Sequence, residues 1–150
     1  MKVVIQRVTE ASVSIGGQVH NAIENGFLVL TGIAHDDTDA DIEYIAKKLV
    51  QLRVFSDESG QMNLSIKDID NGSFLIISQF TLLAQIRKGN RPSFIEAARP
   101  EHAIPLYEKF CKLVTEHSGR SVKKGVFGAD MQISLVNDGP VTIVMDSKEK

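Results

Sequence analysis

One apolar segment limits the folds open to this chain more than any other feature of its sequence. "GFLVLTGIA" (residues 26–34) is a continuous apolar run of strand length. Because it does not alternate with polar residues, we expect a strand that is buried on both faces. "SFLIISQFTLLA" (residues 73–84) predicts a second long apolar strand.

The N-terminal third predicts further strands and a helix. "KVVIQRV" alternates apolar and polar residues as a strand does, and "ASVSIGGQVHNAI" predicts a hairpin at Gly16-Gly17. In "HDDTDADIEYIAKKLVQLRVF" an Asp/Thr cluster suited to a helix N-terminus comes before an apolar stripe at helical spacing. The stripe consists of Ile42, Ile45, Ala46, Leu49 and Val50.

The C-terminal third predicts a second helix and two more strands. Pro100 and Pro105 limit where the helix begins, since neither fits a helix interior, and the helix is expected to end near Ser118-Gly119. Its apolar stripe consists of Ile104, Tyr107, Phe110, Cys111 and Val114. "ADMQISLVNDGPVTIVMD" predicts two strands joined by a turn at residues 137–140, and the charged tail "DSKEK" is expected to fray.

These elements together predict an α/β fold. We expect a single domain over residues 1–150, with mixed or antiparallel β-sheets and two main helices packed on one side, in β/β/α layers. The length of 150 residues and the hydrophobic content of 43% suit one core. No apolar run reaches the roughly 20 residues that a membrane span needs, and the N-terminus lacks a signal-peptide pattern. With a single cysteine, Cys111, the chain is expected to be cytoplasmic and free of disulfides.

Charge and residue clusters exclude several kinds of site. The net charge of −2 argues against a protein that coats nucleic acid through bulk charge, although a local basic patch stays possible. The four histidines (His20, His35, His102 and His117) are scattered, so no metal site and no cofactor are expected. "SGQMN" and "KGNR" match neither known type of phosphate-binding glycine loop. Cys111 lies on the apolar stripe of a helix, which favours a buried, inert thiol.

"SQFTL" (residues 78–82) places polar side chains at the end of an apolar strand. Strand alternation would put Ser78 and Phe80 on one face and Gln79 and Thr81 on the other. These residues either mark a strand leaving the core or border a pocket. No histidine lies nearby in sequence to activate Thr81 or Ser78, so a catalytic triad is not supported.

The segment "RKGNRPSF" brings Arg87, Lys88 and Arg91 together within five residues. It is either a solvated loop or a contact for nucleic-acid phosphates, and Lys123 and Lys124 would extend the basic patch. Phe127 offers either a stacking face for a base or a core side chain.

Gly139-Pro140 raises a separate question, because a proline removes a hydrogen-bond donor at the start of the expected last strand. X-Pro bonds are cis in only about 5–6% of cases in folded proteins, and proline is tolerated at a sheet edge. These considerations do not decide whether the Gly139-Pro140 bond is cis or trans.

Taken together, these segments resemble the D-aminoacyl-tRNA deacylases. The resemblance runs from "MKVVIQRVTEASV" through "SQFTLLA" and "KGNRPSF" to "FGADMQISLVNDGPVT", so it covers essentially the whole chain. Its two most specific motifs, "SQFTL" and "NDGPVT", are both intact and in order. The resemblance implies a homodimer with its active site at the subunit interface, which hydrolyses the ester between a D-amino acid and the 3′-terminal ribose of tRNA.

The resemblance also implies a role for each motif residue. Gly139 and Pro140, joined by a cis bond, would enter the partner's active site and reject L-aminoacyl groups, while Arg7 would brace them from behind. Ser78, Gln79, Phe80 and Thr81 would line the site, Met131 would wall its pocket and Phe127 would lie near the terminal adenosine. Because such a filter excludes side chains of the wrong hand, it would let glycyl-tRNA through.

Two mechanisms and three rival functions stay open at this point. Either Thr81 is a nucleophile, or water attacks with help from the ribose 2′-hydroxyl, while backbone N–H groups near Phe80 and Thr81 stabilise the oxyanion. The first needs a base that the sequence does not supply, so we favour the second. The rivals are a non-catalytic RNA-binding module, an esterase for small molecules and a purely structural dimer.

Overall fold

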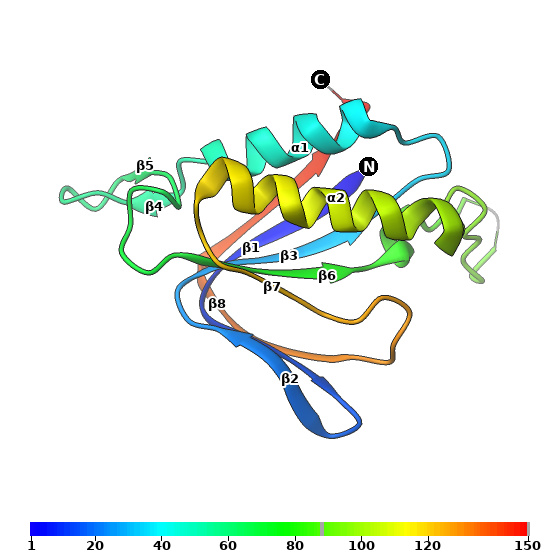
Figure 1. The fold of residues 1–150 in the computed structure, drawn as a ribbon, viewed down its shortest axis with the longest axis horizontal. Coiled ribbons are helices and arrows are strands. Elements are labelled where there is room, and N and C mark those ends of the chain that lie inside the picture. Colours follow the sequence, from blue (N-terminus) through cyan, green and yellow to red (C-terminus); the bar gives the residue numbers. More distant parts are fainter. Residues whose placement is uncertain (88, 150) are drawn as a thin grey trace.

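The two longest strands, β1 (Lys2–Ile15) and β8 (Gln132–Asp146), pair with each other and organise the sheet. The computed structural model describes residues 1–87 and 89–149 (Figure 1). β1 pairs antiparallel with β3 (Gly26–Gly32) through its first half and with β2 (Gln18–Ile23) through its second half. β6 (Ser73–Ser78) and β7 (Val122–Lys124) extend the sheet in parallel beyond β3. The sheet is mixed, as predicted, in the order β2-β1-β3-β6-β7, with β8 on β1.

The sheet curls until it is nearly closed. The predicted hairpin at Gly16-Gly17 is confirmed, and both glycines have the positive φ, +59° and +78°, that tight hairpin turns favour. β2 then reaches the far edge of the sheet, where Asn21 Nδ2 donates to the carbonyl oxygen of Lys124 at 2.7 Å. An apolar cluster fills the inside of the curl: Val8, Ala11, Val13, Ile23, Leu28, Leu75 and Ile77.

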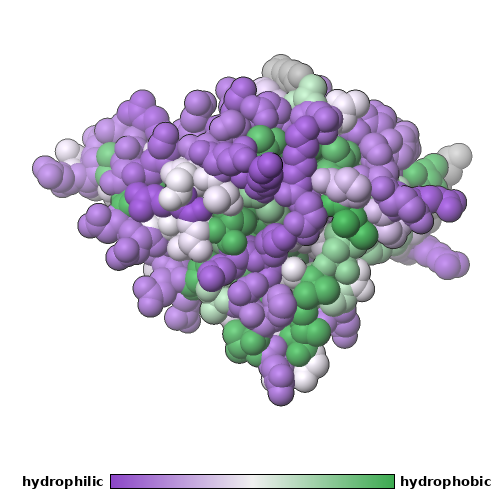
Figure 2. All heavy atoms as spheres, viewed as in Figure 1, coloured by the Kyte–Doolittle hydropathy of each residue, from purple (hydrophilic) through white to green (hydrophobic). Residues whose placement is uncertain are grey.

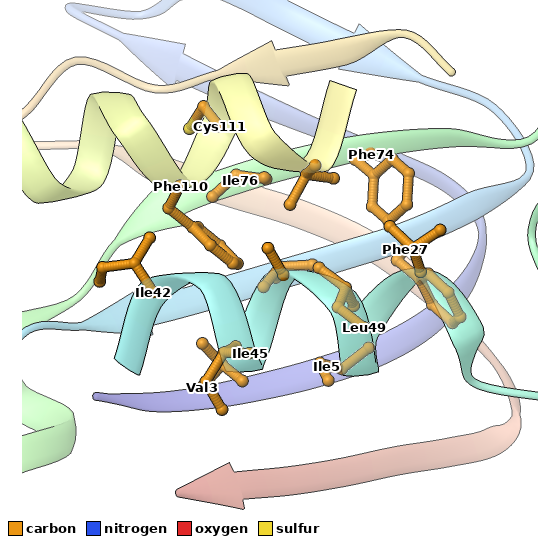
Figure 3. Close-up of a cluster of buried hydrophobic side chains, with 14 of the residues drawn as sticks. Val3, Ile5, Phe27, Ile42, Ile45, Leu49, Phe74, Ile76, Phe110 and Cys111 are labelled. Atoms are coloured by element: carbon orange, nitrogen blue, oxygen red, sulfur yellow. The ribbon is translucent and has the colours of Figure 1, made fainter. Parts of the chain in front are cut away.

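Two helices, α1 (Asp39–Gln51) and α2 (Pro100–Ser118), cover the other face of the sheet (Figure 1). Hydrophilic residues dominate the upper part of Figure 2, where the outer sides of the helices lie. Between helices and sheet lies the larger core of the protein (Figure 3), which includes Val3, Ile5, Phe27, Ile42, Ile45, Leu49, Phe74, Ile76 and Phe110. The predicted placement of both helices on one side is therefore confirmed. Among residues 1–87 and 89–149, no helix has the length and apolar character of a membrane span.

The second helix differs in detail from the prediction. It does end at Ser118, and Gly119 caps it with a φ of +66°, the left-handed conformation that glycine adopts readily. Pro105, however, lies inside the helix. Its exposed position on the outer side lets the helix tolerate one lost hydrogen bond to Glu101. Ile104 lies on the same exposed side, and Ala103 and Leu106 take its expected place in the core.

Both strand ends that carry motif residues were predicted wrongly. β6 stops at Ser78, and Phe80–Leu83 form a short 3-10 helix, η1, so strand alternation does not apply beyond Ser78. Residues 132–146 are one bulged strand rather than two strands joined by a turn. Both halves pair with β1, and in the bulge the single residue Arg7 lies opposite the four residues 138–141. A small two-stranded sheet, β4 (Phe55–Ser56) and β5 (Met62–Leu64), lies outside the main sheet.

The C-terminal tail does not fray as expected, because it is bound to the start of α1. Ser147 is buried, and its N–H donates to the carbonyl oxygen of Met1 at 2.9 Å. Lys148 Nζ lies 3.2 Å from Asp41 and 3.5 Å from Asp37. The acidic cluster predicted to cap α1 thus also holds the tail.

Asp41 links these two contacts and should stabilise the fold in a pH-dependent way. Its carboxylate accepts hydrogen bonds from the N–H and the hydroxyl of Thr38, both at 2.9 Å. Burial by itself would raise the pKa of Asp41, but hydrogen bonds from Thr38, Ser147 and Lys148 outweigh it and hold the pKa well below its usual value. Because the pKa is lower in the folded chain, this stabilisation is complete above about pH 4 and disappears as the pH falls further.

We therefore expect Asp41→Asn to lower the melting temperature at pH 7 by about 2–4 °C, since loss of a helix cap costs about 1 kcal/mol. The difference from the parent should shrink as the pH falls from 4 to 2, because the unfolded parent takes up a proton there while Asp41 of the folded parent stays ionised. Thermal unfolding followed by circular dichroism measures both effects. Asp70→Asn, which removes the same charge from an exposed position, is the matched control. A difference that is constant across this pH range would contradict the role given to Asp41.

Candidate active site

A cavity of about 300 Å³ opens where the parallel strands β3, β6 and β7 end. Segments that follow the carboxyl ends of parallel strands meet at one edge of a sheet, which is where open α/β sheets bind ligands. Here these segments are Ile33 after β3, Gln79 and Phe80 after β6, and residues 127–131 after β7. Ala103 and Tyr107 of α2 close the cavity from above. Parallel pairing thus brings together residues that are far apart in the sequence.

The "SQFT" residues form the rim of this cavity. The N–H of Gln79 donates to the carbonyl oxygen of Thr31 at 2.7 Å, which ties the chain to β3 as it leaves β6. Gln79 Nε2 then donates to Thr81 Oγ1 at 2.5 Å. Phe80 is 55% exposed, and its ring meets that of Phe94 edge-on with 5.0 Å between ring centroids. Ser78, Gln79 and Phe80 line the cavity, whereas Thr81 lies beside it, in contact with Gln79.

The opposite wall is the segment between β7 and β8. Its Phe127 packs on Tyr107 with 6.1 Å between ring centroids and also lines the cavity, so both of its predicted alternatives, core side chain and exposed stacking face, fit its position. Met131 lines the cavity too, and Gly125 makes room for it, since a Cβ there would lie 2.6 Å from Met131 Sδ. This wall is mainly apolar and can hold a flat ring.

Tyr107 belongs to the wall and does not act as an acid or base there. Burial raises the pKa of Tyr107 above its usual value, and the neighbouring Cys111 raises it further. Its hydroxyl donates to the carbonyl oxygen of Ile76 at 2.8 Å. A phenol with this pKa and this partner stays protonated at neutral pH.

Gly139, Pro140 and Arg7 lie apart from this cavity. The Gly139-Pro140 bond is cis, and both residues are exposed on the bulge of β8. Arg7 is 9% exposed and lies behind the bulge, with Nη1 donating to the carbonyl oxygen of Val54 at 2.5 Å. Its Nε lies 3.0 Å from Asp138 Oδ2, at an angle outside that of a hydrogen bond, so this contact is ionic.

The glycine at position 139 is required by the backbone. Its φ is +120°, and a Cβ there would lie 2.9 Å from Val141 Cγ2 and 3.2 Å from Arg7 Nη2. The Asn137 side chain bridges the base of the bulge by donating to the carbonyl oxygens of Arg7 and Val141, both at 3.0 Å. The exposed tip is thus supported at its base by polar contacts of Arg7 and Asn137.

Cys111 and Lys124, two of the remaining candidate reactive residues, each have surroundings that limit their chemistry. Cys111 is buried, and burial raises the pKa of its thiol to about 12, so it is inert as predicted. Across residues 1–87 and 89–149, no group of histidine, cysteine and acidic side chains is arranged to hold a metal. Lys124 pairs with Glu108, which removes it from the expected basic patch. Lys88 lies outside the described residues.

Sequence patterns missed several residues of the cavity. Thr31, Ile33, Ala98, Ala103, Tyr107 and Asp130 all line it. Thr31 had a signal, because it is the one polar side chain in "GFLVLTGIA". Tyr107 was predicted only as part of an apolar stripe, since nothing in a helical pattern shows which end of the stripe borders a cavity.

Comparisons with known proteins connect this geometry to one family. A family model described as D-Tyr-tRNA(Tyr) deacylase matches residues 4–146. Proteins named D-aminoacyl-tRNA deacylase from Porphyromonas gingivalis and Cytophaga hutchinsonii are 59% and 56% identical to this chain. Each of these alignments covers 100% of this chain and 99% of the relative.

Solved structures agree on the fold. A structure described as c-Myc DNA Unwinding Element Binding Protein is 42% identical and superposes with a TM-score of 0.91 over 97% of this chain and 98% of its own. A probable eukaryotic D-amino acid tRNA deacylase reaches a TM-score of 0.83 over 96% of this chain and 97% of its own. At 18% identity, this second structure shows a shared fold only.

Proposed function

This chain belongs to the D-Tyr-tRNA(Tyr) deacylase family, and we propose that it hydrolyses the ester that joins a D-amino acid to the 3′-terminal ribose of tRNA. One observation on the structure supports this proposal independently of the comparisons. Ser78, Gln79 and Phe80 face Phe127 and Met131 across a single cavity of about 300 Å³. The cavity has an apolar wall for a ring and a polar rim for an ester, which are the two parts of an acylated terminal adenosine.

We further propose that Gly139 and Pro140 act as the chirality filter of a partner subunit. They are exposed and lie away from the cavity of their own chain, so they are available to enter another copy. Carbonyl oxygens held rigidly there would accept hydrogen bonds from the substrate ammonium group and crowd an L side chain. A D side chain leaves Cα in the other direction and escapes the clash. Glycine has no side chain to reject, so glycyl-tRNA is also a proposed substrate.

Exposed apolar residues support a homodimer. Val136 and Val144, on either side of the bulge in β8, are 49% and 69% exposed. Apolar residues also gather in the lower part of Figure 2, where β2 and β8 lie in Figure 1. β8 pairs only with β1 among the described residues, which leaves a long strand edge for a second copy to cover.

The test of both proposals is a paired hydrolysis assay on D-tyrosyl-tRNA and L-tyrosyl-tRNA. The parent protein should hydrolyse only the D form. Gly139→Ala should lose much of this discrimination or activity, because the required φ and the contact with Val141 force the tip to move. The strain should cost about 1–3 kcal/mol of stability, so the variant should still fold.

Gly60→Ala is the matched control, since it adds the same Cβ to an exposed glycine of positive φ between β4 and β5, away from the cavity and the bulge. If Gly139→Ala treats both substrates as the parent does, the filter assignment is wrong. If the parent hydrolyses neither substrate above the spontaneous rate, the proposed activity itself is wrong, and a non-catalytic RNA-binding role is favoured.

For the chemical step, we propose attack by water with assistance from the ribose 2′-hydroxyl. Thr81 Oγ1 accepts its hydrogen bond from the amide of Gln79, which is a donor and cannot take a proton from the hydroxyl. Within residues 1–87 and 89–149, no protein acceptor binds the N–H groups of Phe80 or Thr81. These groups are therefore available to stabilise the oxyanion that forms during hydrolysis.

Thr81→Ala separates this mechanism from nucleophilic threonine. On the water mechanism the variant should lose less than about tenfold in kcat, since one hydrogen bond is worth about 0.5–1.5 kcal/mol. Single-turnover hydrolysis of D-tyrosyl-tRNA measures the loss. Thr81→Ser keeps the hydroxyl and should behave as the parent. A loss of several orders of magnitude for Thr81→Ala would favour the nucleophile.

We propose that Arg87 and Arg91 contact the phosphates of the tRNA acceptor end. They lie on a small loop closed by backbone hydrogen bonds between Gln85 and Ser93 at 2.8 and 3.0 Å, directly after the rim of the cavity. Both are exposed, and no carboxylate pairs with either in the described part of the chain. In a chain of net charge −2, unpaired cations at this place are suited to hold a polyanion.

The double variant Arg87→Gln/Arg91→Gln should raise the KM for D-tyrosyl-tRNA about tenfold or more at low salt. The plot of log kcat/KM against log salt concentration should also become less steep, by the amount expected for the loss of about two phosphate contacts. Hydrolysis of the 3′-O-D-tyrosyl ester of adenosine, which has no phosphates, should not change. Lys47→Gln/Lys112→Gln removes the same charge from α1 and α2 as a control. Equal losses on both substrates would contradict a phosphate contact.

A further inference from the structure

Thr31 contains a buried hydroxyl without a partner. Only 2% of the residue is exposed, and no described residue hydrogen-bonds Oγ1. Two other buried side-chain atoms, Arg7 Nε and His117 Nε2, also lack a hydrogen bond in the described part of the chain. Both of these lie within 3.2 Å of a carboxylate. For Thr31 no such neighbour compensates, so no contact with a described residue offsets the cost of burying its hydroxyl.

Packing alone does not call for threonine at this position. Phe27 and Val29 precede Thr31 on the side of β3 that faces the helices, and both lie in the larger core. Valine has nearly the same shape, favours strands and has no hydroxyl to leave unpaired. The hydroxyl therefore calls for an explanation other than folding.

The surroundings of Thr31 point to the candidate active site. Thr31 lies opposite Ser78 in the parallel register of β3 and β6, and both side chains line the cavity. The pairs before them on the same face, Phe27 with Phe74 and Val29 with Ile76, are core contacts. Thr31 and Ser78 thus replace the next apolar pair with two hydroxyls. No described residue hydrogen-bonds Ser78 Oγ either.

We propose that Thr31 is a positioning residue that acts through Ser78 when substrate fills the cavity. In that complex Thr31 Oγ1 donates to Ser78 Oγ, and the Ser78 hydroxyl donates its own proton to an oxygen of the acylated adenosine. Each hydroxyl has one proton to donate and can accept in return, so one chain of two hydrogen bonds satisfies both. The polar group that is unpaired in the free protein then gains its partner only on binding, which favours the bound state. This inference rests on the proposed function.

Thr31→Val is the decisive variant. We expect its melting temperature to rise by about 2–4 °C, because an unpaired buried hydroxyl has been removed. We expect its kcat/KM for D-tyrosyl-tRNA to fall about tenfold, because Ser78 is no longer oriented. Thr31→Ser should restore kcat/KM to within about threefold of the parent, since it keeps the donor. Thr115→Val on α2, whose hydroxyl bonds the carbonyl oxygen of Cys111 outside the site, should leave kcat/KM unchanged.

A double-mutant cycle tests whether Thr31 acts through Ser78. In the Ser78→Ala background, Thr31→Val should cause no further loss of kcat/KM, because the link is already broken. The full tenfold loss in that background would overturn the inference, and so would a Thr31→Val protein that is more stable and fully active. In both cases the parent still hydrolyses its substrate, so the proposed function stands. A parent without hydrolysis overturns both.

Discussion

The parallel pairing of β3 with β6 is the constraint on which the candidate site depends. Gly26 begins this pairing, and a Cβ there would lie 1.9 Å from the carbonyl oxygen of Ser73, so a larger residue would push the two strands apart. The register that follows places Thr31 opposite Ser78 five residues later, where both strands end. The hydrogen bond from the N–H of Gln79 to the carbonyl oxygen of Thr31 continues the pairing into the rim of the cavity. A contact at the start of two strands thus determines the geometry at their other end.

The bulge of β8 arises from the pairing of β1 with β8 and not from the pairing of β3 with β6. β1 and β8 pair on both sides of it. Only Arg7 lies between the paired residues of β1, so the four residues 138–141 of β8 cannot all pair and bulge out of the sheet. The Arg7 side chain fills the space behind them, and Asn137 closes their base. If the tip enters a partner subunit as proposed, these supporting contacts would lower the entropic cost of ordering it there. In the free chain, the cavity and this tip therefore form separately, each supported by its own contacts.

The features that were predictable from sequence are those set by local patterns. The buried strand 26–32, the glycine hairpin and the capped first helix follow from periodicity and turn chemistry over a few residues. The errors arose where the structure of a segment depends on residues that are distant in the sequence. β6 stops at Ser78, where its ladder with β3 ends and the chain turns into the 3-10 helix η1. Residues 132–146 form one strand because β1 is long enough to pair with both halves, which no pattern within the segment reveals. The tail is ordered by Asp37 and Asp41, more than a hundred residues away.

The same distinction separates the site residues that were found from those that were missed. Ser78, Gln79 and Gly139 break a local rule, since polar residues end an apolar run and a glycine precedes a proline inside a strand. Thr31 breaks the rule that buried polar groups are hydrogen-bonded. Only the structure shows this, because the free-energy cost depends on what surrounds the hydroxyl. Residues that are less favourable for folding than an alternative residue type tend to cluster where a protein binds or reacts. Ser78, Gln79 and Thr31 meet at the carboxyl end of one strand pair, so a buried hydroxyl without a partner in the described part of the chain is also what β3 contributes to the lining of the cavity.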